Sequence, residues 1–326
     1  MSEHTLERNI QRVKELLNKP QVEQRTPEWF AQRATVMTAS EVSSCLPRNE
    51  QVCKPYVDLF NLSDFKYSKR AGCNPYQTCN KYIISKCSEF FEGHAYIDSK
   101  YTIHGKKYEN IAQRLYRNVY NTSILEFGLL MHDTYDWLGA SPDGITPEGT
   151  LLEIKCPLSR EIHPDYIPLY YWIQVQQQLE VCDLDVCDFL ECNISQIDNE
   201  YEWNNIVVSG KKDKGIILEN SKVSDDTRWV YPPDKLQTQE EYILWYTEFI
   251  KNNEGYIPLY YIINDWNIIR IKRDKEWWKI ACPIIHETIM KVRQLQSDKK
   301  LFDEYIVKNV RKRKSNIKKS APVCPI

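Results

Sequence analysis

The sequence ASPDGITPEGTLLEIKC, residues 140–156, predicts a β-hairpin that carries two carboxylates and an amine. Asp143 stands in a Ser-Pro-Asp-Gly turn, and further turn-forming residues lead into an apolar pair. Because strand side chains alternate between two faces, Glu153 and Lys155 share one face while Ile154 points the other way, into a core. If the hairpin closes, Asp143 lies beside the face that carries Glu153 and Lys155.

This grouping of charges favours a metal site. Two carboxylates a few ångströms apart repel each other, and loss of solvent raises the pKa of at least one of them. A divalent cation relieves both effects, and carboxylate oxygens with retained waters suit Mg²⁺. Lys155 could orient or deprotonate a water at such a site, or neutralise charge on a phosphoryl group. The alternative is a surface hairpin with an ordinary Glu–Lys pair.

The motif Pro142-Asp143 followed by Glu153-Ile154-Lys155 resembles the signature of the PD-(D/E)xK nucleases. The longer sequences SPDG and EIKCP are similar, more narrowly, to the phage lambda exonuclease and YqaJ-type viral recombinase family. Further matches follow in the family's order and cover roughly residues 27–195, with a weaker likeness to about residue 290. The resemblance implies that Asp143, Glu153 and the Ile154 carbonyl hold the metal.

A second match lies near the N-terminus, where the sequence WFAQR is followed by TASEV. Thr26-Pro27-Glu28 is typical of a helix start, with Thr as the N-cap and Pro at the first position. In the family, the Arg and the Ser of this motif contact the phosphate at a DNA end, and Arg33 and Ser40 occupy those positions. Without the resemblance, Arg33 is a surface cation and Ser40 an N-cap.

Two helical motifs complete the resemblance. Gly105-x-x-x-Glu109-x-x-Ala112 opens a helix, and the resemblance places Glu109 near the metal as a third carboxylate; alternatively, Glu109 compensates the helix N-terminus. Tyr171-x-x-Gln174-x-Gln176 matches the motif whose amides lie beside the active site. Gln176 is the catalytic candidate and Gln174 a DNA contact, since an amide can accept from a water or donate to a phosphate. A solvent-exposed Gln run is the alternative reading.

Two residues beside the acidic hairpin complete the predicted site. Ser141 lies two residues before Asp143, and Arg160 follows the EIKCP motif. Both are candidates for DNA binding. The catalytic set is then as follows: Glu109, Asp143, Glu153, Lys155 and Gln176.

The resemblance implies an α/β fold, with a restriction-endonuclease-like core in which helices flank a mixed sheet, and with helical additions. The predicted organisation is an N-terminal helix over residues 1–25, a nuclease core over 26–197 with an insertion at about 46–92, a C-terminal extension packed on the core over 198–307, and a basic tail over 308–326.

Composition limits the class of protein. The chain has 326 residues, of which 42% are hydrophobic and 27% charged, with no apolar run long enough for a membrane span. Eleven scattered cysteines without CxxC pairs indicate reduced thiols rather than a zinc site. Residues 308–319 hold seven of the 43 basic residues, so the remainder carries 36 against 45 acidic, or −9. DNA contact therefore needs a local patch, and the tail, predicted to be disordered, is one candidate.

The resemblance implies 5′-to-3′ digestion of one strand of duplex DNA, in recombination, repair or viral genome processing. It implies Mg²⁺ as cofactor, with Mn²⁺ as a substitute, and duplex DNA ends as the substrate. A single-strand annealing protein and a homo-oligomer, a trimer by analogy, are implied partners, and a membrane is not. The expected location is a reducing intracellular compartment: for a viral protein, a cytoplasmic viral factory or the nucleus. Two alternatives stay open, a structure- or site-directed endonuclease on the same core and a non-catalytic DNA-binding scaffold.

Overall fold

The computed structural model describes residues 3–68, 70–93, 98–224, 226–234, 236 and 238–318. Its centre is a six-stranded sheet in the order β4-β5-β6-β9-β7-β8. The strands are β4 (Gly144–Ile145), β5 (Thr150–Lys155), β6 (Val186–Ile197), β7 (Asp213–Glu219), β8 (Trp229–Val230) and β9 (Ile257–Lys272). Strands β5 and β6 run parallel and the other neighbours antiparallel, which confirms the predicted mixed sheet.

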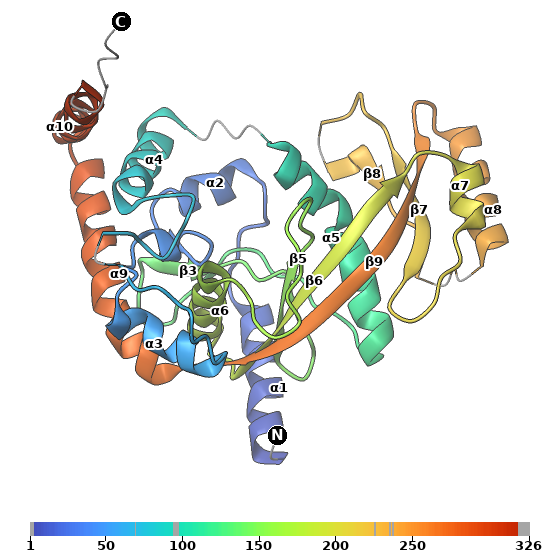
Figure 1. Ribbon diagram of the computed structural model, residues 1–326, viewed down its shortest axis with the longest axis horizontal. Helices are drawn as coiled ribbons and strands as arrows, with labels where there is room; N and C mark the ends of the chain where they lie inside the picture. The colour runs from blue at the N-terminus through green and yellow to red at the C-terminus, as the bar shows by residue number, and fades with distance from the viewer. Residues whose placement is uncertain are drawn as a thin grey trace, which may run out of the picture.

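Helices surround this sheet, and a small second sheet, β1-β3-β2, lies beside it. The helices are α1 (Glu3–Asn18), α2 (Pro27–Arg33), α3 (Glu50–Leu59), α4 (Cys79–Glu92), α5 (Lys100–Tyr120), α6 (Leu169–Cys182), α7 (Glu200–Asn205), α8 (Gln239–Asn252), α9 (Lys275–Gln296) and α10 (Lys299–Lys318). The small strands are β1 (Met37–Thr38), β2 (Leu130–Met131) and β3 (Leu138–Ala140). Figure 1 shows β6 and β9 crossing the molecule, with α4, α9 and α10 gathered at one end and α7 and α8 at the other.

The predicted hairpin is present as β4 and β5. Gly144 pairs with Leu152 and Ile145 with Leu151. The turn closes through a hydrogen bond from the Thr146 N–H to the Thr150 carbonyl (2.9 Å), and Gly149 takes a left-handed conformation with φ of 82°. Local turn chemistry therefore sets the register that brings Asp143 back beside β5.

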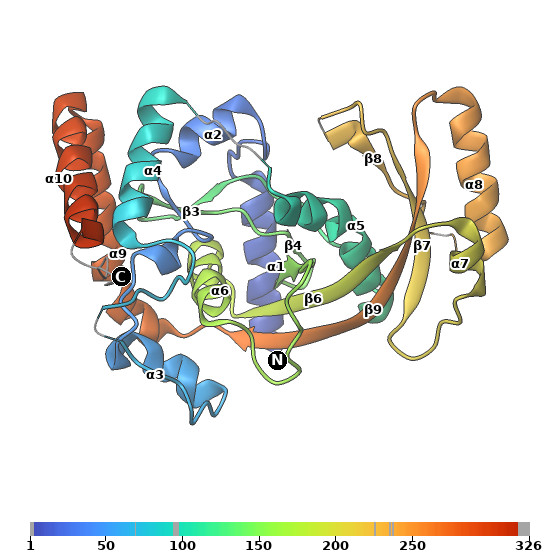
Figure 2. The same ribbon diagram turned by 45° about the horizontal axis from the view of Figure 1, so that its top comes forward.

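Two apolar cores hold the sheet from opposite faces. Leu151 of β5 belongs to the larger core, which contains the buried side of α6. Leu152 and Ile154 belong to a second core together with Tyr108 and Ile111 of α5. Figure 2 shows α5 lying over β6, with α6 on the other side of β4. Ile154 is thus buried away from Glu153 and Lys155, as the period-two pattern predicts.

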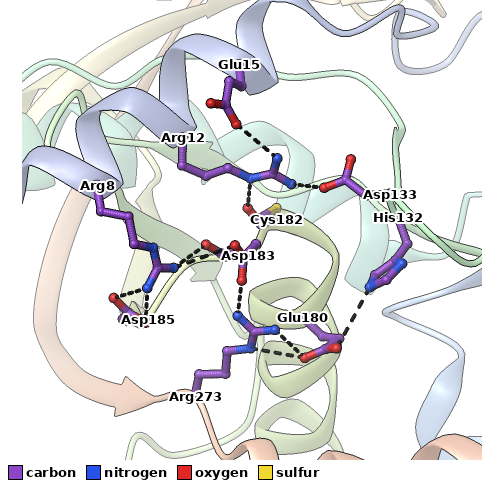
Figure 3. A network of polar contacts seen from close by, with 10 residues as sticks. All are labelled: Arg8, Arg12, Glu15, His132, Asp133, Glu180, Cys182, Asp183, Asp185 and Arg273. Carbon is purple, nitrogen blue, oxygen red and sulfur yellow. Dashed lines mark hydrogen bonds and ion pairs between the residues drawn. The ribbon is translucent and has the colours of Figure 1, made fainter. Parts of the chain in front are cut away.

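Helix α1 is fastened to the C-terminal end of α6 by a polar network (Figure 3). The Arg8 guanidinium donates to the Asp183 carbonyl (2.8 Å), and Arg12 Nε donates to the Cys182 carbonyl (2.8 Å). Arg273, just after β9, also forms an ion pair with the Asp183 carboxylate. These contacts satisfy carbonyls that the end of a helix leaves without intrahelical partners.

The chain beyond residue 197 is more than an extension packed on the core. Strand β9 pairs with β6 from Val186 to Ile197, so it is an interior strand of the central sheet. Helix α9 buries Trp277 and Trp278 in the larger core. The prediction underestimated this segment because strand pairing across about 70 residues has no local signal in the sequence.

The prediction of a disordered tail from residue 308 is wrong for its first part. Helix α10 continues through Lys318, and residues 319–326 lie outside the described part of the chain. The helix is joined to the fold upstream, where Phe302 is fully buried and the Tyr305 hydroxyl donates to Asn80 (2.9 Å). Of the helices in the described ranges, none has both the length and the apolar composition that crossing a membrane requires.

Candidate active site

The residues of the acidic hairpin meet as predicted. The Ile154 N–H donates to Asp143 Oδ2 over 2.7 Å, which fixes the Asp143 carboxylate against β5. Lys155 Nζ donates to Glu153 Oε1, so the amine and one carboxylate are already in contact. The turn and the strand therefore bring two carboxylates and an ammonium to one place, because the hairpin register leaves them no other position.

Glu153 is the most enclosed member of the cluster, with 1% of its surface exposed. Besides the Lys155 contact, Gln174 Nε2 donates to Oε1 and Gln178 Nε2 donates to Oε2, each over 2.6 Å. These two donors leave neither carboxylate oxygen of Glu153 without a hydrogen-bond partner. Helix α6 thus orients Glu153 with two amides spaced four residues apart on one helix face.

The structure corrects the assignment of Gln176. Its amide donates to the Lys272 carbonyl (2.9 Å) and accepts from the Asp274 N–H (2.7 Å), at the junction of β9 and α9. On a helix, residues two apart face in different directions, so Gln176 cannot share the face of Gln174 and Gln178. Gln176 is a structural residue here, and Gln174 contacts the acidic cluster directly. The i, i+4 spacing within the Gln run is the signal that could have identified Gln178.

Lys155 is held as a cation. Burial alone would lower its pKa, but the charges of Glu153 and Asp143 raise the pKa above its ordinary value. The Tyr171 ring lies below the amine, with 5.1 Å between Nζ and the ring centroid. In this state Lys155 supplies positive charge and hydrogen bonds rather than a basic lone pair.

Glu109 extends the cluster from α5. It lines a cavity of about 520 Å³ together with Asp143. Burial raises the pKa of Glu109, and Arg25 and Lys155 oppose this rise. Burial, together with the charges of Glu153 and Glu109, raises the pKa of Asp143 well above its usual value. Glu109 therefore lies within electrostatic reach of Glu153 and Asp143.

This donor set suits a hard divalent cation. Burial and the neighbouring carboxylates raise the pKa of Asp143 and of Glu109, and a cation would relieve this repulsion. Within the described ranges, no three His, Cys, Asp or Glu side chains converge closely enough to form a complete metal site on their own. Mg²⁺ keeps several waters and needs only one or two protein carboxylates, so the Asp143–Glu153 pair fits it better than a closed structural site.

Several residues that line the cavity were not predicted from the sequence. Its lining includes Gln21, Glu23, Gln24, Arg25, Lys106, Glu109, Gln113, Glu126, Asp143, Trp229 and Tyr231. Trp229 and Tyr231 come from β8 and the residues after it, and the Tyr231 hydroxyl donates to the Lys107 carbonyl of α5 over 2.9 Å. Their position depends on the pairing of β8 with β7 at the edge of the central sheet. No local motif in the sequence predicts this pairing.

The predicted end-binding residues lie around Trp29. The Arg33 guanidinium stacks over the Trp29 ring at 4.4 Å, and Trp29 Nε1 donates to Ser141 Oγ over 3.4 Å. Ser40 is exposed, with its hydroxyl 3.4 Å from that of Thr38. Trp29 therefore connects Arg33 to the loop that carries Asp143.

Arg160 is paired within the fold. Its guanidinium donates to Glu191 Oε1, and Glu191 is 1% exposed. Glu191 is also the register partner of Lys155 on the neighbouring parallel strand. No local motif identifies Glu191, because only the pairing of β5 with β6 brings it beside Lys155. Arg160 keeps 26% of its side chain exposed, which leaves it accessible to a ligand.

Residues 63–185, which contain the acidic hairpin and the helix of Glu109, match the sequence model of the YqaJ-like viral recombinase domain. This segment of the chain is similar to that domain. A curated relative is an uncharacterized protein of Acanthamoeba polyphaga mimivirus, 29% identical over 329 residues that cover 87% of this chain and 55% of the relative. The chain thus spans about half the length of that relative.

Two solved structures are also similar to this chain. The alkaline exonuclease LHK-Exo from Laribacter hongkongensis is 18% identical, with a TM-score of 0.45, over 88% of this chain and 99% of that one. A phage related exonuclease from Haemophilus somnus 129PT is 14% identical, with a TM-score of 0.42, over 84% of this chain and 96% of that one.

Proposed function

We propose that this protein is a metal-dependent deoxyribonuclease of the lambda exonuclease type, which digests one strand of duplex DNA from its 5′ end. The observation that carries the proposal is the contact between the Asp143 carboxylate and the Ile154 N–H, because it places Asp143 beside Glu153 and Lys155 inside a YqaJ-like domain. A scaffold without activity would have no use for three carboxylates held against mutual repulsion.

The proposed metal is Mg²⁺, with Mn²⁺ as a substitute. Asp143, Glu153 and the Ile154 carbonyl would hold it, and Glu109 would support it or a second ion. When bound, the cation supplies Lewis acidity at a phosphoryl oxygen and favours ionisation of a nearby water. Gln174 and Gln178 keep Glu153 oriented for this role through their hydrogen bonds to its two oxygens.

The proposed reaction is hydrolysis of a phosphodiester. A water oxygen forms a bond to phosphorus, the bond from phosphorus to the 3′ oxygen breaks, and its electron pair leaves with that oxygen. The water gives one proton to solvent, and the 3′ oxygen takes one. The Lys155 ammonium donates to the phosphoryl oxygens as negative charge accumulates, since it is a cation beside Glu153.

Recognition of the strand end is assigned to Arg33 and Ser40. A guanidinium forms two charge-assisted hydrogen bonds to a phosphate, and an exposed hydroxyl adds a third donor. Stacking on Trp29 holds the Arg33 guanidinium in one plane. Ser141 and Arg160 flank the acidic hairpin, and Arg160 would contact DNA with its exposed edge.

The wider biological setting is part of the same proposal. It comprises duplex DNA ends as substrate, a single-strand annealing partner, a homo-oligomer, and a role in recombination, repair or viral genome processing. An intracellular, reducing compartment is also proposed, and every cysteine in the described ranges is a free thiol.

The deciding experiment compares linear and circular duplex DNA in Mg²⁺. The proposal expects mononucleotides from linear DNA with a 5′ label, no cutting of circular DNA, and loss of activity in excess chelator that added Mg²⁺ restores. Cutting of the circle would favour the endonuclease, and binding without any cutting in Mg²⁺ or Mn²⁺ would favour the scaffold.

A further inference from the structure

We infer that Arg25 is a further phosphate-contacting residue of the active site, which binds the DNA strand inside the cavity that Asp143 lines. The inference rests on the proposed nuclease function. Arg25 lies outside the residues that match the YqaJ-like domain, in the loop between α1 and α2. Three features of this loop lead to the assignment: its backbone conformation, its anchoring and the surroundings of its side chain.

The backbone of Arg25 is in the left-handed region, with φ of 69°. Residues with a Cβ rarely adopt this conformation, and glycine and asparagine are the usual occupants. A long charged side chain at such a position is therefore held there by its surroundings. Backbone strain of this kind concentrates where the direction of a side chain matters to function.

The loop is anchored firmly enough to impose that conformation. Gln24 Nε2 donates to the Phe127 carbonyl (2.9 Å), and the Gly128 N–H donates to Gln21 Oε1 (2.7 Å). A Cβ atom on Gly128 would lie 2.1 Å from the Val22 carbonyl oxygen, so only glycine permits this approach. The contacts of the residues just before Arg25 thus fix where its side chain starts.

The side chain of Arg25 reaches the acidic end of the cavity. Its Nη2 lies 4.0 Å from Glu109 Oε2, and 36% of the side chain is exposed. Arg25 lines the same cavity as Asp143, and Glu126 adds a further carboxylate to that lining. A phosphate that enters this cavity meets several carboxylates, so it needs cations from the protein as well as from the metal. Arg25 provides such a charge beside Glu109.

A guanidinium is suited to this task because it presents parallel N–H groups to two phosphate oxygens. The separation of 4.0 Å from Glu109 is an ion pair without a hydrogen-bond distance. This ion pair keeps the guanidinium at the cavity, where a phosphate that enters meets its positive charge. The role differs from that of Arg33, which stacks on Trp29 and is assigned to the terminal phosphate.

The test replaces Arg25 with glycine, which adopts the left-handed backbone readily. We expect Arg25→Gly to keep or raise the Tm while kcat on 5′-phosphorylated linear duplex in Mg²⁺ falls by about 10- to 100-fold. Arg25→Lys should show a smaller loss. The matched control is Asn121→Gly, another left-handed position (φ of 49°) at the end of α5, which should keep full activity.

A binding measurement separates phosphate contact from indirect action through Glu109. Duplex binding is measured in Ca²⁺ with Glu109→Gln and with the double variant Glu109→Gln/Arg25→Gly. If Arg25 contacts phosphate, the second change weakens binding further. If Arg25 acts only through Glu109, the two proteins bind equally, and the inference is overturned.

Three other results would also decide the matter. If the wild type is active and Arg25→Gly is equally active, the inference about Arg25 is overturned and the proposed nuclease function stands. A loss of activity that only follows a lower Tm assigns Arg25 to the fold and overturns it too. A wild type that cuts no linear DNA overturns the proposed nuclease function, and this inference falls with it.

Discussion

The backbone N–H of Ile154 donates to a carboxylate oxygen of Asp143 across 2.7 Å, and this bond joins the turn to the strand of the acidic hairpin. The two residues are 11 positions apart, and the bond occupies one oxygen of Asp143. In the proposed function, the second oxygen of Asp143 would bind the cation. The position of Asp143 therefore depends on a main-chain donor, which every residue except proline would supply at position 154.

Lys155→Ala should lower kcat by roughly 100- to 1,000-fold or more, because it removes the cation that faces charge developing on the phosphoryl group. Binding of duplex DNA in Ca²⁺ should change little. Initial rates and a binding titration check this, with Lys54→Ala, an exposed lysine on α3, as the control. Undiminished cleavage by Lys155→Ala would remove Lys155 from the mechanism.

A comparison of Gln178→Leu with Gln176→Leu, both on α6, should separate effects on activity from effects on stability. Gln178→Leu removes a donor to the buried Glu153 carboxylate, which leaves that oxygen without this partner. We expect a loss of about 1–3 kcal/mol in the free energy of unfolding together with a large fall in kcat. Denaturant titration and rates measured on folded protein test both effects.

Gln176→Leu serves as the matched variant. It frees the Lys272 carbonyl and the Asp274 N–H, so stability should fall by a similar amount, about 1–3 kcal/mol. The rate per folded molecule should stay near that of the wild type. A fall in kcat as large as that of Gln178→Leu would restore Gln176 to the catalytic set.

Arg33→Ala should slow digestion of 5′-phosphorylated duplex by roughly 10- to 150-fold, the equivalent of about 1.5–3 kcal/mol for a charge-assisted hydrogen bond. Duplex with a 5′-hydroxyl should be affected little, because it lacks the phosphate that the guanidinium binds. Initial rates on the two substrates decide the matter. Equal losses on both would rule out an end-binding role, and a wild type indifferent to the 5′-phosphate would favour the endonuclease.

Removal of residues 308–326 should weaken DNA binding and reduce its salt dependence without changing the rate at saturating DNA. Each lost phosphate contact lowers the log–log salt slope by roughly 0.9. The fold should persist, because Phe302 and Tyr305 of α10 remain to hold the shortened helix. A slope equal to that of the full chain would show that this segment does not touch DNA.

The sequence by itself determined the acidic hairpin, because turn-forming residues and the alternation of strand side chains act between neighbours in the chain. These local signals were enough to place Asp143 beside Glu153 and Lys155 and to direct Ile154 into a core. It also identified the helix that carries Glu109. Only the tertiary structure decided which amides of α6 reach Glu153, because that depends on how a helix buried on nearly all sides is rotated against the sheet. It likewise decided that β9 completes the sheet and that Arg25, Trp229 and Tyr231 join Asp143 around one cavity. Such contacts join residues far apart in the chain, and their free energy appears only once the intervening segments have folded.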